Sequence, residues 1–329
     1  MAVAEEFTVG VDLGGTNTRA VIHSSSRGVL EHMRIQTQRY EAPAVSLADT
    51  VALVRTLLDR AGVPIEHISG VGVGIAGLVD PSGVVINSII LPEWSNVDVV
   101  THLSSELQAR VVVQNDATMA AVGHWMASRR DDAQGTLVCL TLGTGVGAAI
   151  LQGGVPLRGP DGTAGQLGHL AVEVFGRRCS CGSSGCLNAY VSGEAIAERY
   201  CERAGVSRII DPPDSRRVLI AAREGDPDAR EVLEETSLFL GAGLASIVNA
   251  LNPEVIALCG GVSEMGDQLL IPAREHMYHR AFRRPAKRVR VQLGAYGSVT
   301  GAVGAAFSAA ESPTPGVSST AVAVQPVGP

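Results

Sequence analysis

The first half of the chain contains several short apolar runs typical of β-strands. Residues 7–13, 19–23 and 29–35 are three such runs, separated by tight turns. Two further runs, at residues 71–75 and 111–113, are short enough to be buried strands. The pattern therefore predicts a strand-rich first half.

Two stretches near these strands have a helical pattern. Between residues 44 and 61, apolar side chains recur at spacings of three and four, which predicts an amphipathic helix. Gly62 and Pro64 follow it and are typical of a helix end. A second helix is expected from Asp116 to about Ser128, with Asp116 near its N-terminus.

The second half repeats this theme. Residues 137–142 predict a strand, residues 143–145 a turn, and residues 146–151 a returning strand. A helical stretch from about residue 226 to residue 249 leads into a predicted strand at 255–258. Residues 301–310 are small and apolar, and we expect them to form a helix.

Residues 9–22 and 138–151 share one pattern, in which an apolar strand, a Gly/Thr turn and a second apolar strand follow one another. Either copy alone is compatible with an ordinary hairpin. Two copies indicate two similar lobes, each of which presents a hairpin turn to something between them.

Composition and charge narrow the class of protein. The 329 residues are enough for about two domains. They are 46% hydrophobic and 18% charged, unlike a disordered chain. The net charge of -7 argues against nucleic-acid or anionic-membrane partners, and no apolar run is long enough to span a bilayer. The acidic N-terminus has no features of a signal peptide, so we expect a cytoplasmic location.

The two hairpin turns have the residues that phosphate binding requires. Glycine lets backbone N–H groups approach an anion closely, and threonine adds hydroxyl donors. Asp12, at the end of the first strand, is suited to hold Mg²⁺ directly or through water. Candidate phosphate-binding residues are Asp12, Gly14, Gly15, Thr16, Asn17 and Thr18 in the first hairpin, Gly143, Thr144 and Gly145 in the second, and the pair Gly260 and Gly261.

The chain resembles the ROK family (repressors, uncharacterised reading frames and sugar kinases) of the actin-like ATPase and hexokinase superfamily. The likeness covers residues 7–307. It rests on five motifs, which are Asp12-x-Gly-Gly-Thr, Asn115-Asp116-Ala117, the glycine-rich residues 142–149, Gly168-His169, and Cys179-x-Cys-Gly-x-x-Gly-Cys186.

The resemblance implies an α/β, two-lobed actin-like ATPase (ribonuclease-H-like) fold with its active site in the interlobe cleft. ATP and the substrate, a small sugar-like polyol, would bind in that cleft with Mg²⁺. We expect a small lobe of residues 1–115 plus about 298–311, and a large lobe of residues 116–297 with a zinc loop. Residues 312–329, rich in Pro, Ser and Thr, are expected to be a disordered tail. The resemblance also implies a homodimer.

By the same resemblance, Asp116 is the catalytic base. A carboxylate is needed because a sugar hydroxyl is a poor nucleophile until its proton is accepted. The competing interpretation is that Asp116 only caps the helix that follows it. Expected substrate-binding residues are Gly77, Asn87, Asn115, Asp116, Gln166, His169 and Asn188.

Three of the six cysteines lie within eight positions, and with one histidine they form a Cys₃His set. This set, made of His169, Cys179, Cys181 and Cys186, is sufficient for a closed tetrahedral zinc site of structural type. A disulfide is the less favoured interpretation because the compartment is expected to be reducing. The other cysteines, Cys139, Cys201 and Cys259, have apolar neighbours and are expected in the core.

Two positions depart from the pattern of sugar-phosphorylating relatives, which typically carry glutamate there. Gln166 is the first residue of the segment Gln166-Leu-Gly-His169. Asn188 lies two residues after Cys186, the last cysteine of the metal-binding motif. An amide keeps hydrogen-bonding reach but loses the negative charge. The catalytic motifs are intact, so we expect an altered substrate, and a C7-cyclitol of secondary metabolism is the preferred interpretation. The alternative is an ordinary hexose or N-acetylhexosamine kinase.

Functions of other classes are less compatible with the sequence. A repressor of the family would carry a helix-turn-helix domain before the first hairpin, which here begins near Phe7. A sugar-sensing module without turnover would not need the Asn115-Asp116 pair. An acetate-kinase-like or chaperone ATPase of the superfamily would not need the zinc motif.

Overall fold

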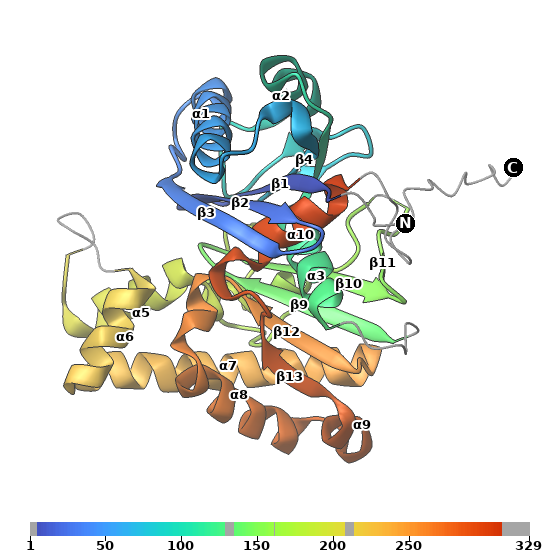
Figure 1. The fold of residues 1–329 in the computed structure, drawn as a ribbon. Coiled ribbons are helices and arrows are strands. Elements are labelled where there is room, and N and C mark those ends of the chain that lie inside the picture. The colour runs from blue at the N-terminus through green and yellow to red at the C-terminus, as the bar shows by residue number, and fades with distance from the viewer. Residues whose placement is uncertain (1–4, 129–134, 161, 208–213, 311–329) are drawn as a thin grey trace, which may run out of the picture.

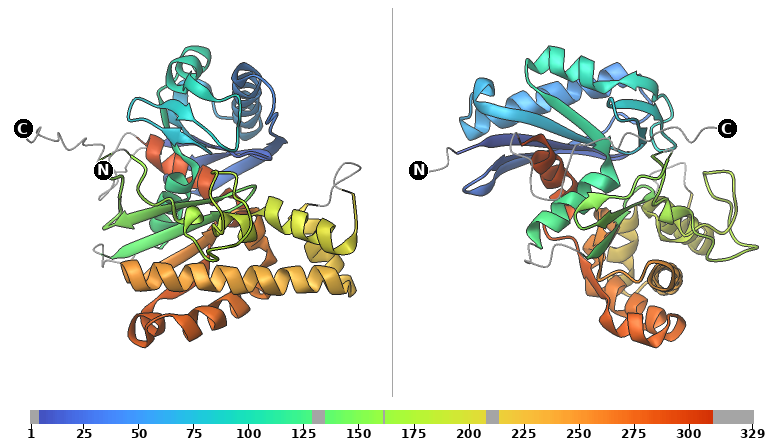
Figure 2. Two further views of the ribbon diagram at one scale, coloured as in Figure 1. Left: turned by 180° about the vertical axis from the view of Figure 1, so that it is seen from behind. Right: turned by 90° about the vertical axis from the view of Figure 1, so that its right-hand side faces the viewer.

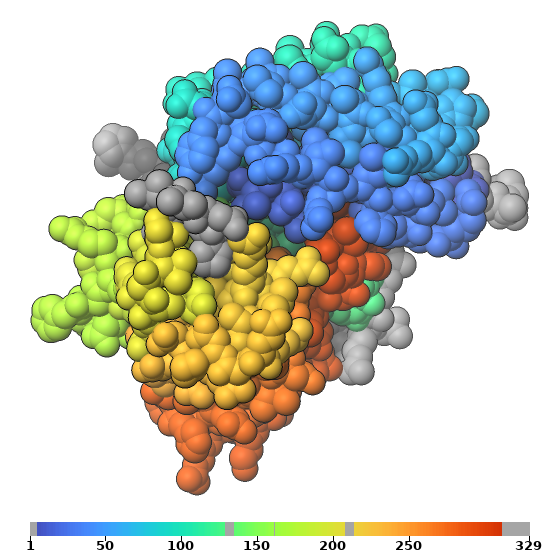
Figure 3. All heavy atoms as spheres, turned by 90° about the vertical axis from the view of Figure 1, so that its left-hand side faces the viewer, coloured from blue at the N-terminus to red at the C-terminus, as the bar shows by residue number. Residues whose placement is uncertain are grey.

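The chain forms two α/β lobes, each built on a five-stranded sheet, as Figure 1 shows. The computed structural model describes residues 5–128, 135–160, 162–207 and 214–310. In the space-filling view of Figure 3, the N-terminal lobe lies above the larger lobe. None of the helices in the described ranges combines the length and apolar character that a bilayer span requires.

The first sheet has the strand order β3-β2-β1-β4-β8. Its strands are β1 (Phe7–Leu13), β2 (Asn17–Ser24), β3 (Gly28–Gln36), β4 (Ile68–Ile75) and β8 (Val111–Asn115). The first three form an antiparallel meander, whereas β4 and β8 run parallel to β1. A smaller sheet beside it contains β5 (Leu78–Val79), β6 (Val84–Asn87) and β7 (Ser95–Asp98).

Helices α1 (Pro43–Ala61) and α2 (Val99–Leu107) cover one face of the first sheet (Figure 1). The apolar stripe of α1 that the sequence predicted is buried, and each buried Leu or Val stabilises the fold by about 1.5–3 kcal/mol. Gly62 ends α1 in the left-handed conformation, at φ 65°, which glycine adopts without strain. A short 3₁₀ turn, η1 (Ile65–His67), then leads into β4.

The second sheet repeats the arrangement with the order β11-β10-β9-β12-β13. Its strands are β9 (Thr136–Leu142), β10 (Val146–Gln152), β11 (Val155–Pro156), β12 (Val255–Cys259) and β13 (Arg290–Leu293). The long helix α7 (Pro227–Leu251) runs beneath this sheet, as Figure 2 shows. The remaining helices of this lobe are α4 (Asn188–Val191), α5 (Gly193–Ala204), α6 (Ser215–Glu224), α8 (Asp267–Arg280) and α9 (Arg283–Arg288), with 3₁₀ turns η2 (Leu167–His169), η3 (Gly261–Met265) and η4 (Gly297–Val299).

Two helices lie between the sheets, α3 (Asp116–Ala127) and α10 (Thr300–Ala309) (Figure 1). Glycine allows α10 to approach the first sheet closely, because a Cβ at Gly10 would lie 1.8 Å from the carbonyl oxygen of Ala302. A Cβ at Gly304 would likewise lie 1.7 Å from the carbonyl oxygen of Met119 in α3. The C-terminal helix therefore packs on the first sheet and on α3, and the lobe boundaries expected from the sequence stay a prediction. The expected tail, residues 312–329, lies outside the described residues.

Candidate active site and metal centre

The first glycine hairpin is held by its own sheet. Gly14 donates its backbone N–H to the carbonyl of Asn17 at 3.2 Å. Thr37, just after β3, donates its N–H to the carbonyl of Thr16 at 3.0 Å. The Thr16 side chain remains exposed at the tip. The turn is therefore fixed from within the first lobe, with Thr16 available to a ligand.

Thr18 differs from its expected place. Its side chain is only 3% exposed, and its hydroxyl shares a 2.9 Å hydrogen bond with the hydroxyl of Thr37. Thr18, Ala20 and Ile22 are all buried, on one face of β2. The hydroxyl of Thr18 is therefore directed into the sheet packing, whereas the hydroxyl of Thr16 contacts the second lobe.

The second glycine hairpin contacts the first where the two lobes meet. Its turn is closed by a 2.9 Å hydrogen bond from Gly143 N–H to the carbonyl of Gly145. Between the two turns, the hydroxyls of Thr16 and Thr144 are 2.8 Å apart. The two predicted phosphate-binding turns thus lie side by side, one from each lobe.

Ile90 fills the space beside both turns. A Cβ added to Gly15 would lie 2.3 Å from Ile90 Cγ2, and one added to Gly145 would lie 2.9 Å from Ile90 Cδ1. Arg39 donates from Nε to the carbonyl of Ile90 at 2.7 Å and pairs through its guanidinium with Glu194 of the second lobe. These contacts form a bridge between the lobes that the sequence did not reveal.

Asp116 lies at the first turn of α3, where β8 ends. Asn115 is the residue that caps this helix, because its Oδ1 accepts from the N–H groups of Ala117 and Thr118 at 3.0 and 3.2 Å. The Nδ2 group of Asn115 donates to Asp116 Oδ1 at 3.0 Å. The Asp116 carboxylate is therefore oriented by its neighbour and is not consumed as a cap.

The environment of Asp116 raises its pKa. Burial is the main cause, and hydrogen bonds from the backbone N–H groups of Ala117 and Asp116 and from the Asn115 side chain oppose it. As a whole residue, Asp116 is half-buried. An aspartate with a raised pKa at the end of a strand has the properties of a general base.

Asp12 is the second carboxyl group of this region. Burial, together with the negative charge of Asp116, raises its pKa to about 7, while Arg19 has the opposite effect. A Cβ at Gly301, the second residue of α10, would lie 3.1 Å from the Asp12 carboxylate. Asp12 thus lies near the N-terminal end of a helix, and its oxygens are ligands of the kind Mg²⁺ prefers.

Two other expected substrate residues gather beside Asp116. The carbonyl of Gly77 accepts a 3.1 Å hydrogen bond from Asn115 Nδ2. A Cβ at Gly77 would lie 2.9 Å from the carbonyl oxygen of Asn87, which is itself exposed. Gly77, Asn87, Asn115 and Asp116 therefore form one surface at the edge of the first lobe.

Gly260 and Gly261 lie at the end of β12. Gly260 has φ 86°, and a Cβ there would lie 2.6 Å from the carbonyl oxygen of Leu142. Gly261 borders a pocket of about 250 Å³ between α6 and η3. The pocket is lined by Ser215, Arg216, Leu219, Ile220, Arg223, Gly261, Glu264 and Met265. Sequence reasoning missed the α6 residues, although Val218, Leu219 and Ala222 have helical spacing.

His169, Cys179, Cys181 and Cys186 come together in the second lobe. Their ligand atoms all lie within 4.8 Å of one another. Cys179 Sγ is 3.6 Å from His169 Nδ1, and Cys181 Sγ is 3.7 Å from Cys186 Sγ. A tetrahedral zinc ion with Zn–S bonds of about 2.3 Å separates its sulfur ligands by about 3.8 Å. The set therefore fits zinc, and burial lowers the pKa of His169, which favours the neutral imidazole that binds metal.

Two glycines determine the shape of the metal loop. Gly182 and Gly185 have φ of 92° and 73°, which other residues rarely adopt. A Cβ at Gly185 would also lie 1.6 Å from the carbonyl oxygen of Glu173. The loop can therefore turn back on its own cysteines only with glycine at these positions.

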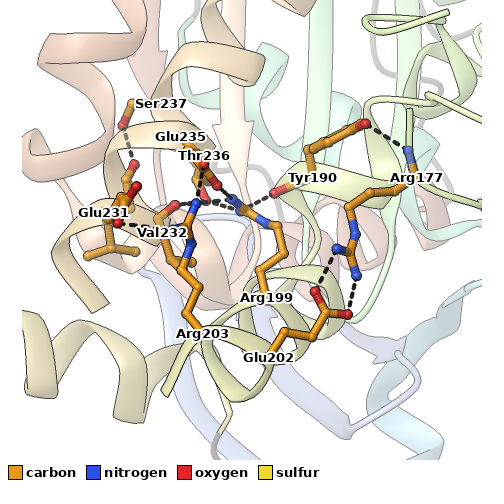
Figure 4. Close-up of polar contacts among 11 residues, drawn as sticks. Arg177, Tyr190, Arg199, Glu202, Arg203, Glu231, Val232, Glu235, Thr236 and Ser237 are labelled. Carbon is orange, nitrogen blue, oxygen red and sulfur yellow. Dashed lines mark hydrogen bonds and ion pairs between the residues drawn. The ribbon is translucent and has the colours of Figure 1, made fainter. Parts of the chain in front are cut away.

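The metal loop is anchored on the helices beside it, as Figure 4 shows. The guanidinium of Arg177 donates two hydrogen bonds of 2.7 Å to Glu202 of α5. The backbone N–H of Arg177 donates to the Tyr190 hydroxyl at 2.8 Å. The buried Arg199 of α5 in turn donates to the carbonyl of Tyr190 and to Glu235 of α7. These charge-assisted contacts join the loop to α4, α5 and α7.

The two amides that depart from the family pattern lie in different surroundings. Gln166 is exposed just before η2, and no side-chain hydrogen bond joins it to another described residue. Asn188 is half-buried, with Oδ1 accepting from Val146 N–H at 2.7 Å and Nδ2 facing Cys179 Sγ at 3.7 Å. A sugar contact by either residue stays a prediction.

Comparisons with known proteins agree with this geometry. A glucokinase of Halalkalibacterium halodurans is 30% identical over 312 residues, covering 92% of this chain and 94% of that protein. A kanosamine kinase of Amycolatopsis mediterranei is 30% identical over 301 residues, covering 90% and 95%.

The solved structure of a ROK family glucokinase from Streptomyces griseus, in complex with glucose and AMPPNP, matches with a TM-score of 0.80 at 29% identity, covering 91% of this chain and 98% of that one. This match confirms the two-lobed α/β fold expected from the sequence. The model of the ROK family matches residues 8–312. The chain belongs to the ROK family.

Proposed function

We propose that this protein is an ATP-dependent kinase that phosphorylates a hydroxyl group of a hexose. The observation that carries the proposal is the position of Asp116, which Asn115 orients beside the second glycine hairpin, where that hairpin meets the first. The glucokinases among its relatives, and the glucose and AMPPNP in the structure from Streptomyces griseus, support the same activity.

In this proposal Asp116 accepts the proton of the substrate hydroxyl as the phosphoryl group is transferred. The raised pKa of Asp116 makes it a stronger base than an exposed aspartate. Asn115 orients the carboxylate through its 3.0 Å hydrogen bond, and Gly77 holds Asn115 in turn. The chain thus supplies a base whose direction is fixed before the substrate arrives.

The two hairpins would bind the phosphates of ATP. Their backbone N–H groups and the hydroxyls of Thr16 and Thr144 are donors for phosphate oxygens. When bound, Mg²⁺ neutralises charge on the phosphates, and Asp12 is the residue placed to hold it. The pocket beside Gly261 would take the nucleoside part of ATP.

The relatives favour a hexose over the C7-cyclitol that the sequence suggested. The relatives that are at least 30% identical are glucokinases and a kanosamine kinase, and none of these names a cyclitol substrate. The substitution of glutamate by Gln166 and Asn188 is therefore compatible with a hexose site. Gln166 is exposed, and its amide can donate and accept hydrogen bonds. It would be the residue that makes the sugar preference of this protein differ from that of relatives with glutamate there.

The metal centre would have a structural role. Three cysteines and one histidine fill the four positions of tetrahedral zinc, so no position is left for a catalytic water. Metal binding at such a site contributes on the order of 10 kcal/mol where folding and metal uptake are coupled. The loop would therefore lose its shape without metal.

The test is ADP release from Mg-ATP across a panel of glucose, N-acetylhexosamines, the amino sugar kanosamine and C7-cyclitols, with Asp116→Asn as the blank. Efficient turnover of glucose or another hexose is the expected result. Turnover confined to cyclitols would replace the hexose proposal with the interpretation of an altered substrate. No turnover with any acceptor would favour a sugar-sensing module.

A further inference from the structure

Val146, the first residue after the second hairpin turn, is held on both sides by residues next to metal ligands. Its N–H donates to Asn188 Oδ1 at 2.7 Å. On its other side Gly168 packs so closely that a Cβ there would lie 2.0 Å from the Val146 carbonyl oxygen. Asn188 follows Cys186 by two residues, and Gly168 directly precedes His169. The shape of the metal loop therefore bears directly on the backbone of the hairpin.

The other end of the Asn188 amide faces the metal centre. Because the Val146 N–H fixes Oδ1 as the acceptor, Nδ2 is the group directed at Cys179 Sγ, at 3.7 Å. A metal-bound thiolate accepts hydrogen bonds from N–H groups, and such second-layer contacts commonly change metal affinity by about 10–100-fold. One side chain thus links a metal ligand to the hairpin.

An amide suits this position better than the glutamate typical of relatives. It donates at one end and accepts at the other, whereas an ionised carboxylate only accepts. A negative charge at this distance from Cys179 would also be repelled by the thiolates of a metal site. The replacement of glutamate by Asn188 therefore has a physical consequence even without any change of substrate.

The Asn188 side chain is also close to the turn itself, and the backbone that carries it is held in place. A Cβ at Gly145 would lie 3.3 Å from Asn188 Oδ1. The preceding Leu187 is fully buried and donates its N–H to the carbonyl of Leu170 at 2.9 Å. A movement of the metal loop would therefore be passed to the turn at Gly145.

We propose that Asn188 is a positioning residue that couples the metal loop to the hairpin that binds ATP phosphates. This inference rests on the proposed function of that hairpin. It reassigns Asn188 from the sugar contact expected by family resemblance to an internal support. Sugar recognition near the metal loop then falls to Gln166, whose amide is exposed.

Two substitutions separate the two bonds of the amide. Asn188→Asp keeps the acceptor for Val146 N–H but replaces the donor to Cys179 with a negative charge. Asn188→Leu has a similar size and removes both bonds. The control is Ser183→Ala, because the Ser183 side chain is exposed in the same loop. Zinc release to a chromophoric chelator and AMPPNP affinity by calorimetry are measured on the zinc-loaded proteins.

We expect Asn188→Asp to release zinc at least about tenfold faster while AMPPNP affinity stays within about twofold. Asn188→Leu should release zinc faster and also bind AMPPNP about three- to tenfold more weakly. Ser183→Ala should match the wild type in both. Wild-type zinc release together with wild-type AMPPNP affinity in Asn188→Leu would overturn the proposal. Neither readout needs sugar or turnover, so a failure of the kinase proposal would be distinguishable.

Discussion

The two glycine hairpins have the same sequence pattern but different supports. The first turn is held by hydrogen bonds from Gly14 and Thr37, both within the first lobe's own sheet segment. The second turn has its own hydrogen bond, from Gly143 to Gly145, and is held in addition from outside its sheet. Asn188 accepts from the Val146 N–H, and the Gly193 N–H donates to the carbonyl of Gly143 at 2.7 Å. The second hairpin therefore depends on a metal loop that the first does not need.

This difference shows that an internal repeat need not imply equal stability. Both copies present glycine and threonine to the cleft, so their ligand chemistry is alike. The first copy is stabilised by the strands that contain it, whereas the second is stabilised by residues 42 and 50 positions away in the sequence. Substitutions that remove the contacts of only one hairpin should therefore destabilise that hairpin and leave the other unchanged.

The largest expected effect on turnover comes from a substitution that lies outside both hairpins. Asp116→Asn should lower kcat by about 10²–10⁴-fold, since an amide cannot accept the hydroxyl proton. AMPPNP affinity should stay near that of the wild type because neither hairpin is altered. Steady-state ADP release and calorimetry check this pair of results, and near-normal turnover would remove Asp116 as the base.

The next largest effect should come from Cys181→Ser, which removes one ligand of the metal set. We expect loss of bound zinc and of the local loop shape, followed by a weakened second hairpin. Elemental analysis and circular dichroism measure metal content and folding. Full zinc content in this variant would exclude Cys181 as a ligand.

A matched pair of glycine substitutions compares the supports directly. In Gly168→Ala the new Cβ meets backbone, the Val146 carbonyl oxygen at 2.0 Å, and should destabilise the fold by about 1–3 kcal/mol. In Gly15→Ala the nearest atom, at 2.3 Å, is the Cγ2 methyl group of Ile90, a side-chain atom that can give way more readily than backbone. Thermal unfolding should therefore show a larger loss for Gly168→Ala. An equal or reversed order would argue against a rigid support behind the second hairpin.

Lowering the pH should reduce activity by protonating the carboxyl groups of Asp116 and Asp12. The base must be unprotonated, and burial raises the pKa of Asp116 above its ordinary 3.8. Asp12, whose pKa is raised to about 7, must likewise lose its proton to bind Mg²⁺. The value of kcat/KM for sugar should therefore fall as the pH is lowered from 8 to 5. Zinc content measured at each pH separates this effect from metal loss, and a flat profile with zinc retained would contradict it.

The smallest expected effect is at the bridge between the lobes. Arg39→Ala removes the ion pair with Glu194 and the hydrogen bond to the Ile90 carbonyl. Partly exposed pairs contribute up to about 1 kcal/mol, so AMPPNP affinity should change by no more than about fivefold. Glu194→Gln should give a similar or smaller change, because it leaves the bond to Ile90 in place. A change above tenfold in either variant would mean that the bridge controls closure.

Local sequence signals predicted the parts of this site that depend on residue type and spacing. Glycine turns between apolar runs located both hairpins, and the clustered cysteines with His169 located the metal set. The helix beginning at Asp116 was also predicted correctly. Thr18 was misjudged, although its shared alternation with Ala20 and Ile22 would have placed it in the buried face of β2.

The remaining features depend on tertiary contacts that no local pattern records. Asn115, not Asp116, caps α3, and the Nδ2 group of Asn115 donates a 3.1 Å hydrogen bond to the carbonyl of Gly77, which is distant in the sequence. Helix α8 contains Pro272, which the sequence pattern would take as a helix break. The Asn188 contact with Val146 exists only because the metal loop folds back onto the second sheet.

The measurement that tests the difference between the hairpins most directly is AMPPNP affinity of the wild-type protein with zinc bound and after zinc is removed by a chelator under reducing conditions. Circular dichroism controls for global folding. Removal of zinc should weaken AMPPNP binding by about tenfold or more while most of the fold persists. Unchanged affinity in fully zinc-free, folded protein would show that the second hairpin does not depend on the metal loop.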